Sequence, residues 1–349
     1  MKVLLTGSAG FIGSAIGRQL AGAGHEVVGA DLMLDSAHGS SVPPDGTLRL
    51  DVRDAGSDTW AEALHGVDVV CHQAALVGAG VLVADLPDYA SHNDVGTAEL
   101  LAAMHEADVA RLVLASSMVV YGEGRYACAE HGRQLPPARP VAALEAGDFE
   151  NHCPHCDRQL EWRLVPEDAR LDPRSSYAAS KLAQEHYASS WVRQAGAAAI
   201  ALRYHNVYGP MMPRDTPYSG VAAMFRSSLE RGEAPRVFED GGQMHDFVHV
   251  DDVARANVLA LEAVVAGSTP RWSAYNVCSG RPVTILDVAA RVAEGTGRDV
   301  APEVTGGFRP GDVRHVVASP ALATSELGFT AEIGPDVGLR GFATAPLRS

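Results

Sequence analysis

The chain has 349 residues, of which 46% are hydrophobic, so it can bury a sizeable core in one large or two modest domains. Its 43 acidic residues against 28 Lys and Arg give a formal net charge of -15, which opposes binding to nucleic acid because no local basic patch offsets it. No apolar run reaches the roughly 18 residues of a membrane span, and residues 1–7 turn too early for a signal peptide. We therefore expect a cytoplasmic protein without a membrane partner.

The first motif is a glycine turn between a strand and a helix. A short apolar run over residues 2–6 leads into Gly7-Ser8-Ala9-Gly10-Phe11-Ile12-Gly13, and a helical pattern follows through Ala21. Glycine lets the backbone approach a pyrophosphate closely, and the helix N-terminus presents free N–H groups to it. This context predicts a dinucleotide site that includes the following residues: Gly7, Gly10, Phe11, Ile12 and Gly13.

A second predicted strand, over residues 25–30, ends at Asp31. A carboxylate there would accept both hydroxyls of an adenosine ribose and repel a 2'-phosphate, so NAD is favoured over NADP. Further strands over residues 48–52 and 68–75 alternate with helices, which predicts an α/β fold with a Rossmann-like, doubly wound parallel sheet. The remaining cofactor contacts predicted at this edge are Asp51, Val52, Ala74, Ala75, Asn93 and Ser116.

Tyr177 and Lys181 stand four residues apart in an Ala-rich helical run, so both lie on one face of the helix. A free phenol has a pKa near ~10, and a fixed cation beside it lowers that pKa by favouring the phenolate. A proton acceptor for a hydroxyl at neutral pH needs this shift. The pair therefore predicts an acid/base site, although the same spacing alone also occurs by chance on helix surfaces.

Several motifs occur in a characteristic order along nearly the whole chain. They are Gly7-x-x-Gly10-x-x-Gly13, Asp31, Ser116-Ser117-x-x-Val120-Tyr121-Gly122, Tyr177-x-x-x-Lys181, Arg203-Tyr204-His205-Asn206-Val207-Tyr208-Gly209-Pro210, Asp246-Phe247-Val248-His249-Val250-Asp251-Asp252 and Arg309-Pro310-Gly311-Asp312. In this order they resemble the extended short-chain dehydrogenase/reductase family of nucleotide-sugar epimerases and dehydratases, UDP-glucose and UDP-glucuronate 4-epimerases in particular.

The resemblance implies roles for three side chains. Ser117 would orient the sugar hydroxyl, Tyr177 would act as acid and base, and Lys181 would hold the cofactor ribose and depress the tyrosine pKa. It further implies a nucleotide-sugar substrate and a homodimer formed through the helices around residues 93–105 and 177–191.

Asn206 and Arg309 match family positions that contact the nucleotide or diphosphate of the substrate, where donors face anionic oxygens. His245 stands where the family usually has Arg, and a shorter, partly charged imidazole cannot reproduce a bidentate phosphate contact. Either Arg314 or Arg214 compensates, or the nucleotide sits differently. We expect the sugar pocket to be shaped by Met118, Tyr218 and Phe238.

The interval between Ser117 and Tyr177 is longer than in the family and contains Cys128-Ala129-Glu130-His131 and Cys153-Pro154-His155-Cys156. Two short pairs joined by a longer loop have the spacing of a structural zinc site. The predicted ligands are Cys128, His131, Cys153 and Cys156, with His152 or His155 as alternatives to His131. The competing interpretation is a flexible loop with free thiols. We hypothesise that this insert borders the sugar pocket.

These observations predict a Rossmann domain over residues 1–210, with a zinc knuckle inserted at about 123–170. A smaller, interleaved substrate lobe over residues 211–349 returns to the sheet near 245–280. The predicted function is an NAD-dependent nucleotide-sugar epimerase that oxidises its sugar transiently, most plausibly at C4.

Two alternatives stay open. A 4,6-dehydratase needs a further acid/base pair after the active-site Ser, and Met118-Val119 cannot transfer protons, which argues against it without excluding other sugar-nucleotide oxidoreductases. The second alternative is a catalytically idle NAD-binding regulator. The intact set Ser117, Tyr177 and Lys181 argues against the regulator.

Overall fold

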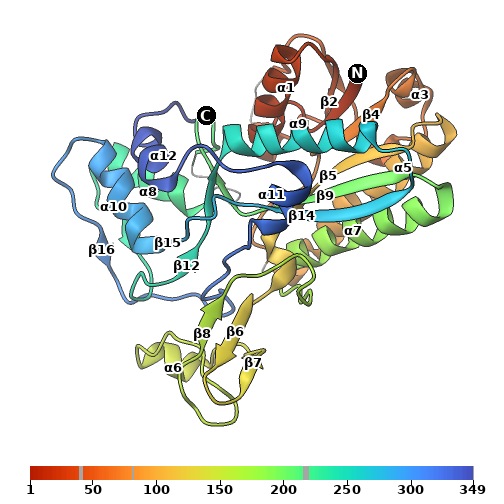
Figure 1. The fold of residues 1–349 in the computed structure, drawn as a ribbon. Coiled ribbons are helices and arrows are strands. Elements are labelled where there is room, and N and C mark those ends of the chain that lie inside the picture. The colour runs from red at the N-terminus through yellow and green to blue at the C-terminus, as the bar shows by residue number, and fades with distance from the viewer. Residues whose placement is uncertain (39–41, 81, 215–219, 349) are drawn as a thin grey trace.

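The computed structural model describes residues 1–38, 42–80, 82–214 and 220–348. Its centre is a parallel sheet with the strand order β14-β9-β5-β4-β1-β2-β3 (Figure 1). The strands are β1 (Lys2–Thr6), β2 (Glu26–Asp31), β3 (Thr47–Arg49), β4 (Val69–His72), β5 (Arg111–Ser117), β9 (Ala198–Tyr204) and β14 (Arg271–Val277). The order reverses at β1, between β2 and β4, and ligands of such sheets bind outside the carboxyl ends of the strands at this point.

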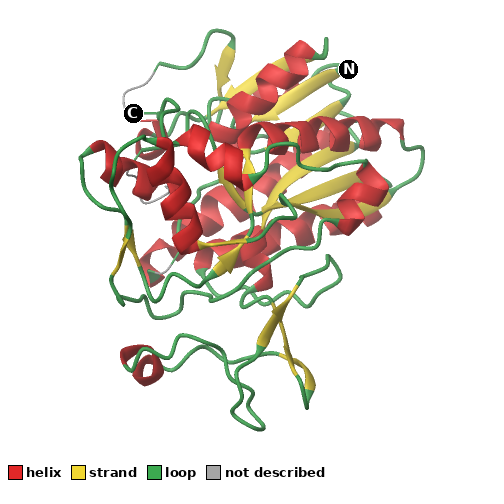
Figure 2. Cartoon of the chain, turned by 60° about the vertical axis from the view of Figure 1, so that its left-hand side comes forward, coloured by secondary structure: helices red, strands yellow, loops and turns green. Residues whose placement is uncertain are grey.

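Helices cover both faces of the sheet (Figures 1 and 2). Val3 and Leu5 of β1 pack with helices α1 (Phe11–Gly22), α9 (Val250–Ala266) and α11 (Ala321–Leu327). Leu4, between them in sequence, packs on the other face with α3 (Asp58–Leu64), α5 (Gly96–Glu106) and α7 (Ser176–Ala195). Because side chains alternate along a strand, one short apolar run supplies both halves of the core. The predicted Rossmann-like α/β fold is confirmed.

The helix expected around residues 93–105 begins earlier and is built from three pieces. They are α4 (Leu86–Tyr89), the π-helical turn η3 (Ala90–Val95) and α5. Single π-turns inside α-helices often mark functional sites. Here the turn carries Asn93, whose side chain is fully buried.

The shorter elements of this half lie mostly at the carboxyl edge. They are α2 (Asp35–His38), η1 (Val52–Asp54), η2 (Val83–Asp85) and η4 (Met118–Tyr121). Strand β3 ends at Arg49, so it is shorter than the strand predicted over residues 48–52. The Asp51 carboxylate instead accepts the Arg53 N–H at 2.9 Å and begins the 3-10 turn η1.

The second lobe packs its helices around a core of its own that includes Phe225, Phe247 and Phe342. Its elements are α8 (Val221–Glu230), β11 (Arg236–Val237), β12 (Met244–His245), β15 (Val283–Thr284), α10 (Ile285–Gly295), β16 (Glu303–Val304) and α12 (Pro335–Phe342). A parallel pair, β10 (Asn206–Tyr208) and β13 (Phe247–His249), joins it to the sheet. The chain returns to the sheet with α9 and β14.

The insert projects from the rest of the molecule, at the bottom of Figure 1. It consists of α6 (Val141–Glu145) and a sheet with the order β7-β6-β8, formed by β6 (Arg125–Cys128), β7 (Gly132–Gln134) and β8 (Glu161–Arg163). Its buried apolar cluster is small: Tyr126, Cys128, Cys153 and Leu160. So few buried side chains supply little stability by themselves.

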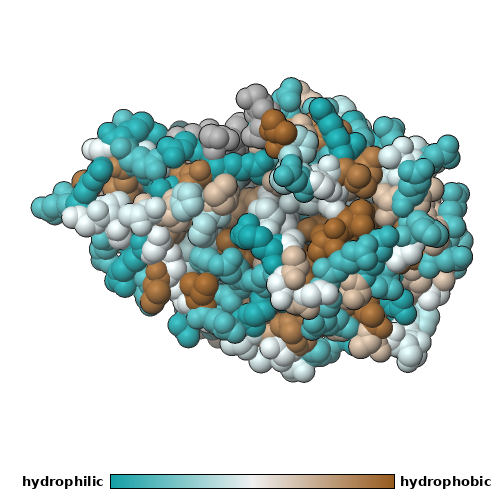
Figure 3. Space-filling model, turned by 90° about the horizontal axis from the view of Figure 1, so that it is seen from above, coloured by the Kyte–Doolittle hydropathy of each residue, from teal (hydrophilic) through white to brown (hydrophobic). Residues whose placement is uncertain are grey.

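The surface is mainly polar, with separate apolar patches on the face seen in Figure 3. Scattered apolar side chains of this kind are normal for a globular chain. Within the described residues, we find no helix with the length and apolar character that crossing a membrane demands.

Candidate active site

The glycine turn lies at the carboxyl end of β1 and packs closely against the segment after β4. Gly7 has a left-handed backbone (φ 66°), and a Cβ there would lie 2.7 Å from the Ala74 nitrogen. A Cβ on Gly13 would lie 2.0 Å from the Gly7 carbonyl oxygen. Helix α1 begins immediately afterwards at Phe11, so its free N–H groups face the turn. These residues fit a dinucleotide pyrophosphate, because both the space and the donors are backbone features.

Asp31 ends β2 beside this turn. Its carboxylate accepts the N–H groups of Ala9 (3.0 Å) and Met33 (2.8 Å), and the His38 Nε2 atom lies 3.3 Å away. Burial raises the carboxyl pKa, but the hydrogen bonds from His38 and Met33 outweigh burial and hold the pKa of Asp31 below its usual value. The carboxylate is therefore charged at neutral pH, as a partner of ribose hydroxyls must be.

The other predicted cofactor residues line the same edge. Asn93 binds the backbone of Leu76 through both side-chain atoms, at 2.7 and 3.0 Å, and donates to the Ser180 hydroxyl at 2.9 Å. It thereby fixes the loop after Ala74 and Ala75 to helix α7. Val52 is buried below the start of α5.

The predicted catalytic side chains come from two adjacent elements. Ser117 ends β5, and Tyr177 lies in the first turn of α7, which begins behind the Ser175 side chain that accepts the Ala178 N–H at 3.1 Å. The Lys181 ammonium lies 6.0 Å from the centre of the Tyr177 ring and donates to the Ala115 carbonyl at 3.0 Å. Strand β5 thus anchors the lysine beside the tyrosine.

Burial dominates the electrostatics of this pair. It raises the pKa of Tyr177 well above that of a free phenol, against a hydrogen bond with Ser117 that lowers it. Burial also lowers the pKa of Lys181 to about 7, against the charge of Glu185 that raises it. Burial of the phenol therefore opposes the phenolate, and positive charge at this edge would favour it.

Ser116 has a different role in the structure from that of its neighbour. Its hydroxyl is buried and donates to Glu185 of α7 at 2.5 Å, and Arg203 holds the same carboxylate at 2.9 and 2.8 Å. Arg203 also donates to the Tyr121 hydroxyl at 2.8 Å. This buried network joins β5, α7 and β9, the elements that carry Ser116, Glu185 and Arg203, and so fixes the backbone beside the predicted catalytic residues.

The predicted substrate residues form two separate groups, one where β10 pairs with β13 and one around Phe238. The Asn206 side chain donates to the Asp246 carbonyl at 3.0 Å and lies 3.7 Å from the sulfur of Met118. The Arg309 guanidinium stacks on the Phe238 ring at 5.2 Å. Tyr218 lies outside the described residues.

His245 is buried, and burial lowers its pKa to about 4, so it is neutral at pH 7. Its Nδ1 atom has no hydrogen-bond partner among the residues that the structure describes. Of the two proposed substitutes for the missing guanidinium, Arg314 is buried against Glu150, Glu239 and Asp240. Arg214 pairs with Glu230 on the surface. Both are already held by carboxylates.

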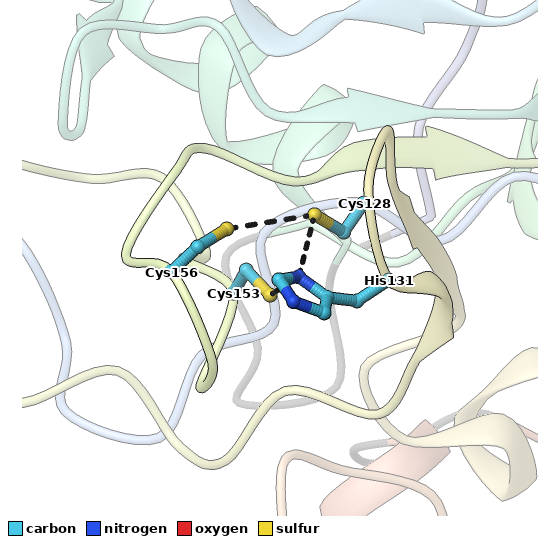
Figure 4. Close-up of side chains that lie close together, drawn as sticks. All are labelled: Cys128, His131, Cys153 and Cys156. Carbon is cyan, nitrogen blue, oxygen red and sulfur yellow. Dashed lines mark hydrogen bonds between the residues drawn. The ribbon is translucent and has the colours of Figure 1, made fainter.

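The four predicted metal ligands converge in the insert (Figure 4). Cys128 Sγ lies 3.5 Å from His131 Nδ1 and 3.7 Å from Cys156 Sγ, and Cys153 Sγ lies 3.5 Å from the same imidazole nitrogen. A tetrahedral zinc centre with bonds of about 2.3 Å to sulfur and 2.0 Å to nitrogen has donor atoms roughly 3.5–3.8 Å apart. The donor set and its spacing fit one zinc ion.

The structure also distinguishes the three candidate imidazoles. Both nitrogens of His152 are engaged, with the Asp157 carbonyl at 2.8 Å and the Asp148 carboxylate at 3.1 Å. The exposed His155 ring packs at a tilt against the His131 ring, with centres 5.0 Å apart. His131 is therefore the imidazole that completes the cluster.

Two close contacts of the site escaped the sequence interpretation. Gly80 has a left-handed backbone (φ 62°), and a Cβ there would lie 2.5 Å from the Tyr177 nitrogen, so the loop presses against the start of α7. Arg348, near the C-terminus, donates to the Ala9 carbonyl at 2.7 Å. The sequence Gly78-Ala79-Gly80 indicates a turn and could have predicted the close contact at Gly80. No local sequence pattern indicates the contact of Arg348 with Ala9.

The fold and this edge together define an α/β protein with a Rossmann-type dinucleotide edge. The family model for the NAD dependent epimerase/dehydratase family matches residues 3–143 and 163–278. The chain therefore belongs to that family. The unmatched interval, 144–162, contains Cys153 and Cys156.

Individual relatives agree with the family. A dTDP-L-rhamnose 4-epimerase of Burkholderia thailandensis is 34% identical over 343 residues, which cover 94% of this chain and 90% of the relative. A UDP-glucose 4-epimerase of Corynebacterium glutamicum is 30% identical, with coverage of 95% and 91%. The solved structure of Thermus thermophilus UDP-glucose 4-epimerase with NAD is 31% identical and superposes with a TM-score of 0.75, over 98% of each chain.

Proposed function

We propose that the protein is an NAD-dependent nucleotide-sugar epimerase that inverts C4 of a hexose linked to UDP or dTDP. The observation that carries the proposal is the juxtaposition of Ser117, Tyr177 and Lys181 with the glycine turn at one edge of the sheet. The 4-epimerase relatives, which span nearly the whole chain, support it.

The glycine turn, Asp31 and Lys181 would hold NAD, which would supply an acceptor, and afterwards a donor, for the hydride of C4. Tyr177 removes the proton of the C4 hydroxyl, and Ser117 donates a hydrogen bond to that oxygen. The positive charge of Lys181 and that of the bound nicotinamide counteract the burial that raises the Tyr177 pKa. The keto sugar turns in the pocket before it is reduced from its other face, so NAD is regenerated.

A 4,6-dehydratase is the second candidate, because one structural neighbour is a dTDP-glucose 4,6-dehydratase with NAD bound. Dehydration requires a further proton donor and acceptor close to Ser117. The two residues that follow Ser117 in η4 are Met118 and Val119, which supply neither. Epimerisation is therefore the better interpretation.

The test is conversion without added cofactor. Purified protein is incubated with a panel of UDP-, dTDP-, GDP- and ADP-linked hexoses and uronates, and the products are separated by chromatography with mass detection. Epimerisation gives a product of unchanged mass and new retention. A loss of one water would instead show the dehydratase, and no product across the panel would refute both.

We also propose that Cys128, His131, Cys153 and Cys156 hold a structural zinc ion. Four protein donors within 4.8 Å of one another support this assignment, and a full set of four would leave no coordination position for substrate. Metal analysis of the purified chain tests it, with one zinc per chain expected.

A homodimer in the cytoplasm completes the proposal. Val95 (49% exposed) at the end of η3 and Tyr187 (45% exposed) of α7 present apolar surface on the two helices that the resemblance implicates. Light scattering in solution tests the assembly, and a monomer at micromolar concentration would refute it.

A further inference from the structure

The insert is tied to the substrate lobe by two arginines that share one carboxylate. Arg139 of the insert donates to both oxygens of Glu239, at 2.8 and 2.9 Å, and Arg314 donates to Glu239 at 2.9 Å. All three side chains are at most 3% exposed. Buried bidentate pairs of this kind fix both position and orientation, because a displaced partner would leave a charge uncompensated.

Glu239 has a left-handed backbone with φ 54°, which is unfavourable for a residue with a Cβ. The conformation is held by the two arginines and by a hydrogen bond from its own N–H to the Gly307 carbonyl at 2.7 Å. Phe238 precedes it and carries the Arg309 guanidinium on its ring. The Phe238–Glu239 turn therefore decides where Arg309, a predicted nucleotide contact, is placed.

A second connection runs from the lobe toward the metal cluster through Glu150. Its carboxylate accepts from Arg314 at 2.6 and 3.0 Å and from His315 Nε2 at 3.0 Å. The Met244 N–H donates to His315 Nδ1 at 2.9 Å, so the proton of that imidazole is on Nε2 and points to Glu150. Glu150 stands three residues before Cys153 in the chain.

Both arginine connections meet the same short segment, residues 149–153. Arg139 donates to the Phe149 carbonyl at 2.8 Å, next to Glu150. Cys153, at the end of the segment, is one of the four proposed ligands. The insert around it has a very small apolar cluster, so a bound metal would supply a constraint on this segment that apolar packing does not.

We propose that the zinc ion sets the affinity of the substrate lobe for a nucleoside diphosphate, by holding Glu150 and Arg139 against the Phe238–Glu239 turn. Loss of the metal releases the 149–153 segment, and the strained Glu239 then relaxes and displaces Arg309. The inference rests on the proposed sugar-nucleotide function, but its readout is nucleotide binding and not turnover.

The experiment compares three variants of the full chain. Cys156→Ser removes a zinc ligand, whereas Glu150→Gln leaves all four ligands and weakens only the connection to Arg314 and His315. Glu130→Gln is the matched control, because it removes a carboxylate of the insert that pairs with the exposed Arg158 on the surface. Zinc content is measured by mass spectrometry, the Kd values of dTDP and UDP by calorimetry, and bound NAD by absorbance.

We expect Cys156→Ser to lose zinc and to weaken nucleotide binding about tenfold, since it releases one buried charge-assisted contact network. Glu150→Gln should retain zinc and weaken binding to a similar degree. The double variant should be no weaker than the single ones, because both act through one connection. The control should keep both zinc and affinity, and NAD content should stay constant throughout.

Unchanged nucleotide affinity in a zinc-free Cys156→Ser chain would overturn the inference, and so would unchanged affinity in Glu150→Gln. A wild-type chain that contains no zinc, or that binds neither dTDP nor UDP, would overturn it as well. A chain that binds dTDP or UDP in a zinc-dependent manner but converts no sugar would refute the proposed function and leave this inference standing.

Discussion

The cofactor edge and the insert achieve order by different means. At the cofactor edge, two apolar layers hold the strands, and the glycine turn is defined by backbone packing such as that of Gly7 against Ala74. In the insert, the apolar cluster contains four buried residues, two of which are cysteines, and the remaining order comes from buried ion pairs and the proposed metal. The first is stabilised by burial and the second by charge and coordination.

This difference matches the extent of the family resemblance. The family model follows the cofactor edge continuously but omits residues 144–162 of the insert. The cofactor edge therefore lies within the part of the chain that the family model matches, whereas the proposed control of the substrate lobe involves a segment outside it. Changes at the edge should affect the reaction and the fold, and changes in the insert should affect metal content and nucleotide affinity.

The largest effect is expected from Tyr177→Phe, which removes the proton acceptor and leaves the ring. Conversion of the sugar nucleotide should fall by roughly 10²–10⁴-fold, the usual contribution of a positioned acid/base group. Gln194→Ala is the control, because Gln194 is an exposed residue of the same helix that lies outside the proposed dimer contact. Initial rates by chromatography distinguish the two, and full activity of Tyr177→Phe would disprove the acid/base assignment.

Gly13→Ala should break the cofactor edge. Its new Cβ would lie 2.0 Å from the Gly7 carbonyl oxygen, so the turn must move and NAD binding should weaken at least tenfold. Gly22→Ala, at the end of the same helix, has no neighbouring atom within 4 Å of its Cβ. The amount of copurified NAD and the Kd of NAD are measured for both variants. Equal NAD binding by the two variants would contradict the assignment of the glycine turn to the cofactor.

The sequence was sufficient for the cofactor edge because its signals are local. A strand, a glycine turn and a helix follow one another within residues 2–22, and Asp31 ends the next strand. The π-helical turn around Asn93 has no such signal, since its residues resemble those of an ordinary helix. Its geometry is imposed by the contacts of Asn93 with Leu76 and Ser180.

For the insert, the sequence predicted the four ligands but not what they support. The cysteine spacing is a short-range pattern, so it is visible without a structure. The pair Arg139 and Glu239 is separated by 100 positions, and no local rule relates such residues. Likewise, Arg314 is held by Glu150 of the insert and by Glu239 of the lobe. These partners are distant in sequence, so the sequence could not show that Arg314 is already paired and not free to bind phosphate.

His131→Ala tests the insert alone. It should lose zinc and lower the apparent melting temperature by several degrees, because structural zinc binding contributes directly to local folding. His155→Ala removes the neighbouring imidazole, which packs against His131 without being needed as a ligand, and should retain the metal. If His131→Ala retained zinc and His155→Ala lost it, the ligand would be His155 and not His131.

The smallest effect concerns the pH dependence of the catalytic lysine in the cofactor-free chain. Burial lowers the pKa of Lys181 from 10.5 to about 7, so the unfolded chain binds more protons than the folded one between these values. The cost of burying the ammonium is therefore complete below pH 7 and declines as the pH rises toward 10.5. Between pH 6 and pH 9 the wild type should gain roughly 2–3 kcal/mol relative to Lys181→Met.

Thermal melting at the two pH values measures this difference, and Lys181→Met should be more stabilised at pH 6 than at pH 9. Lys2→Met is a stringent control, because Lys2 is the one other lysine of the chain and its side chain is partly exposed. A difference between wild type and Lys181→Met that does not change with pH would show that the ammonium is well solvated. Lys181 would then carry its charge throughout this pH range, and a permanent cation would stand beside Tyr177, whose own burial raises its pKa.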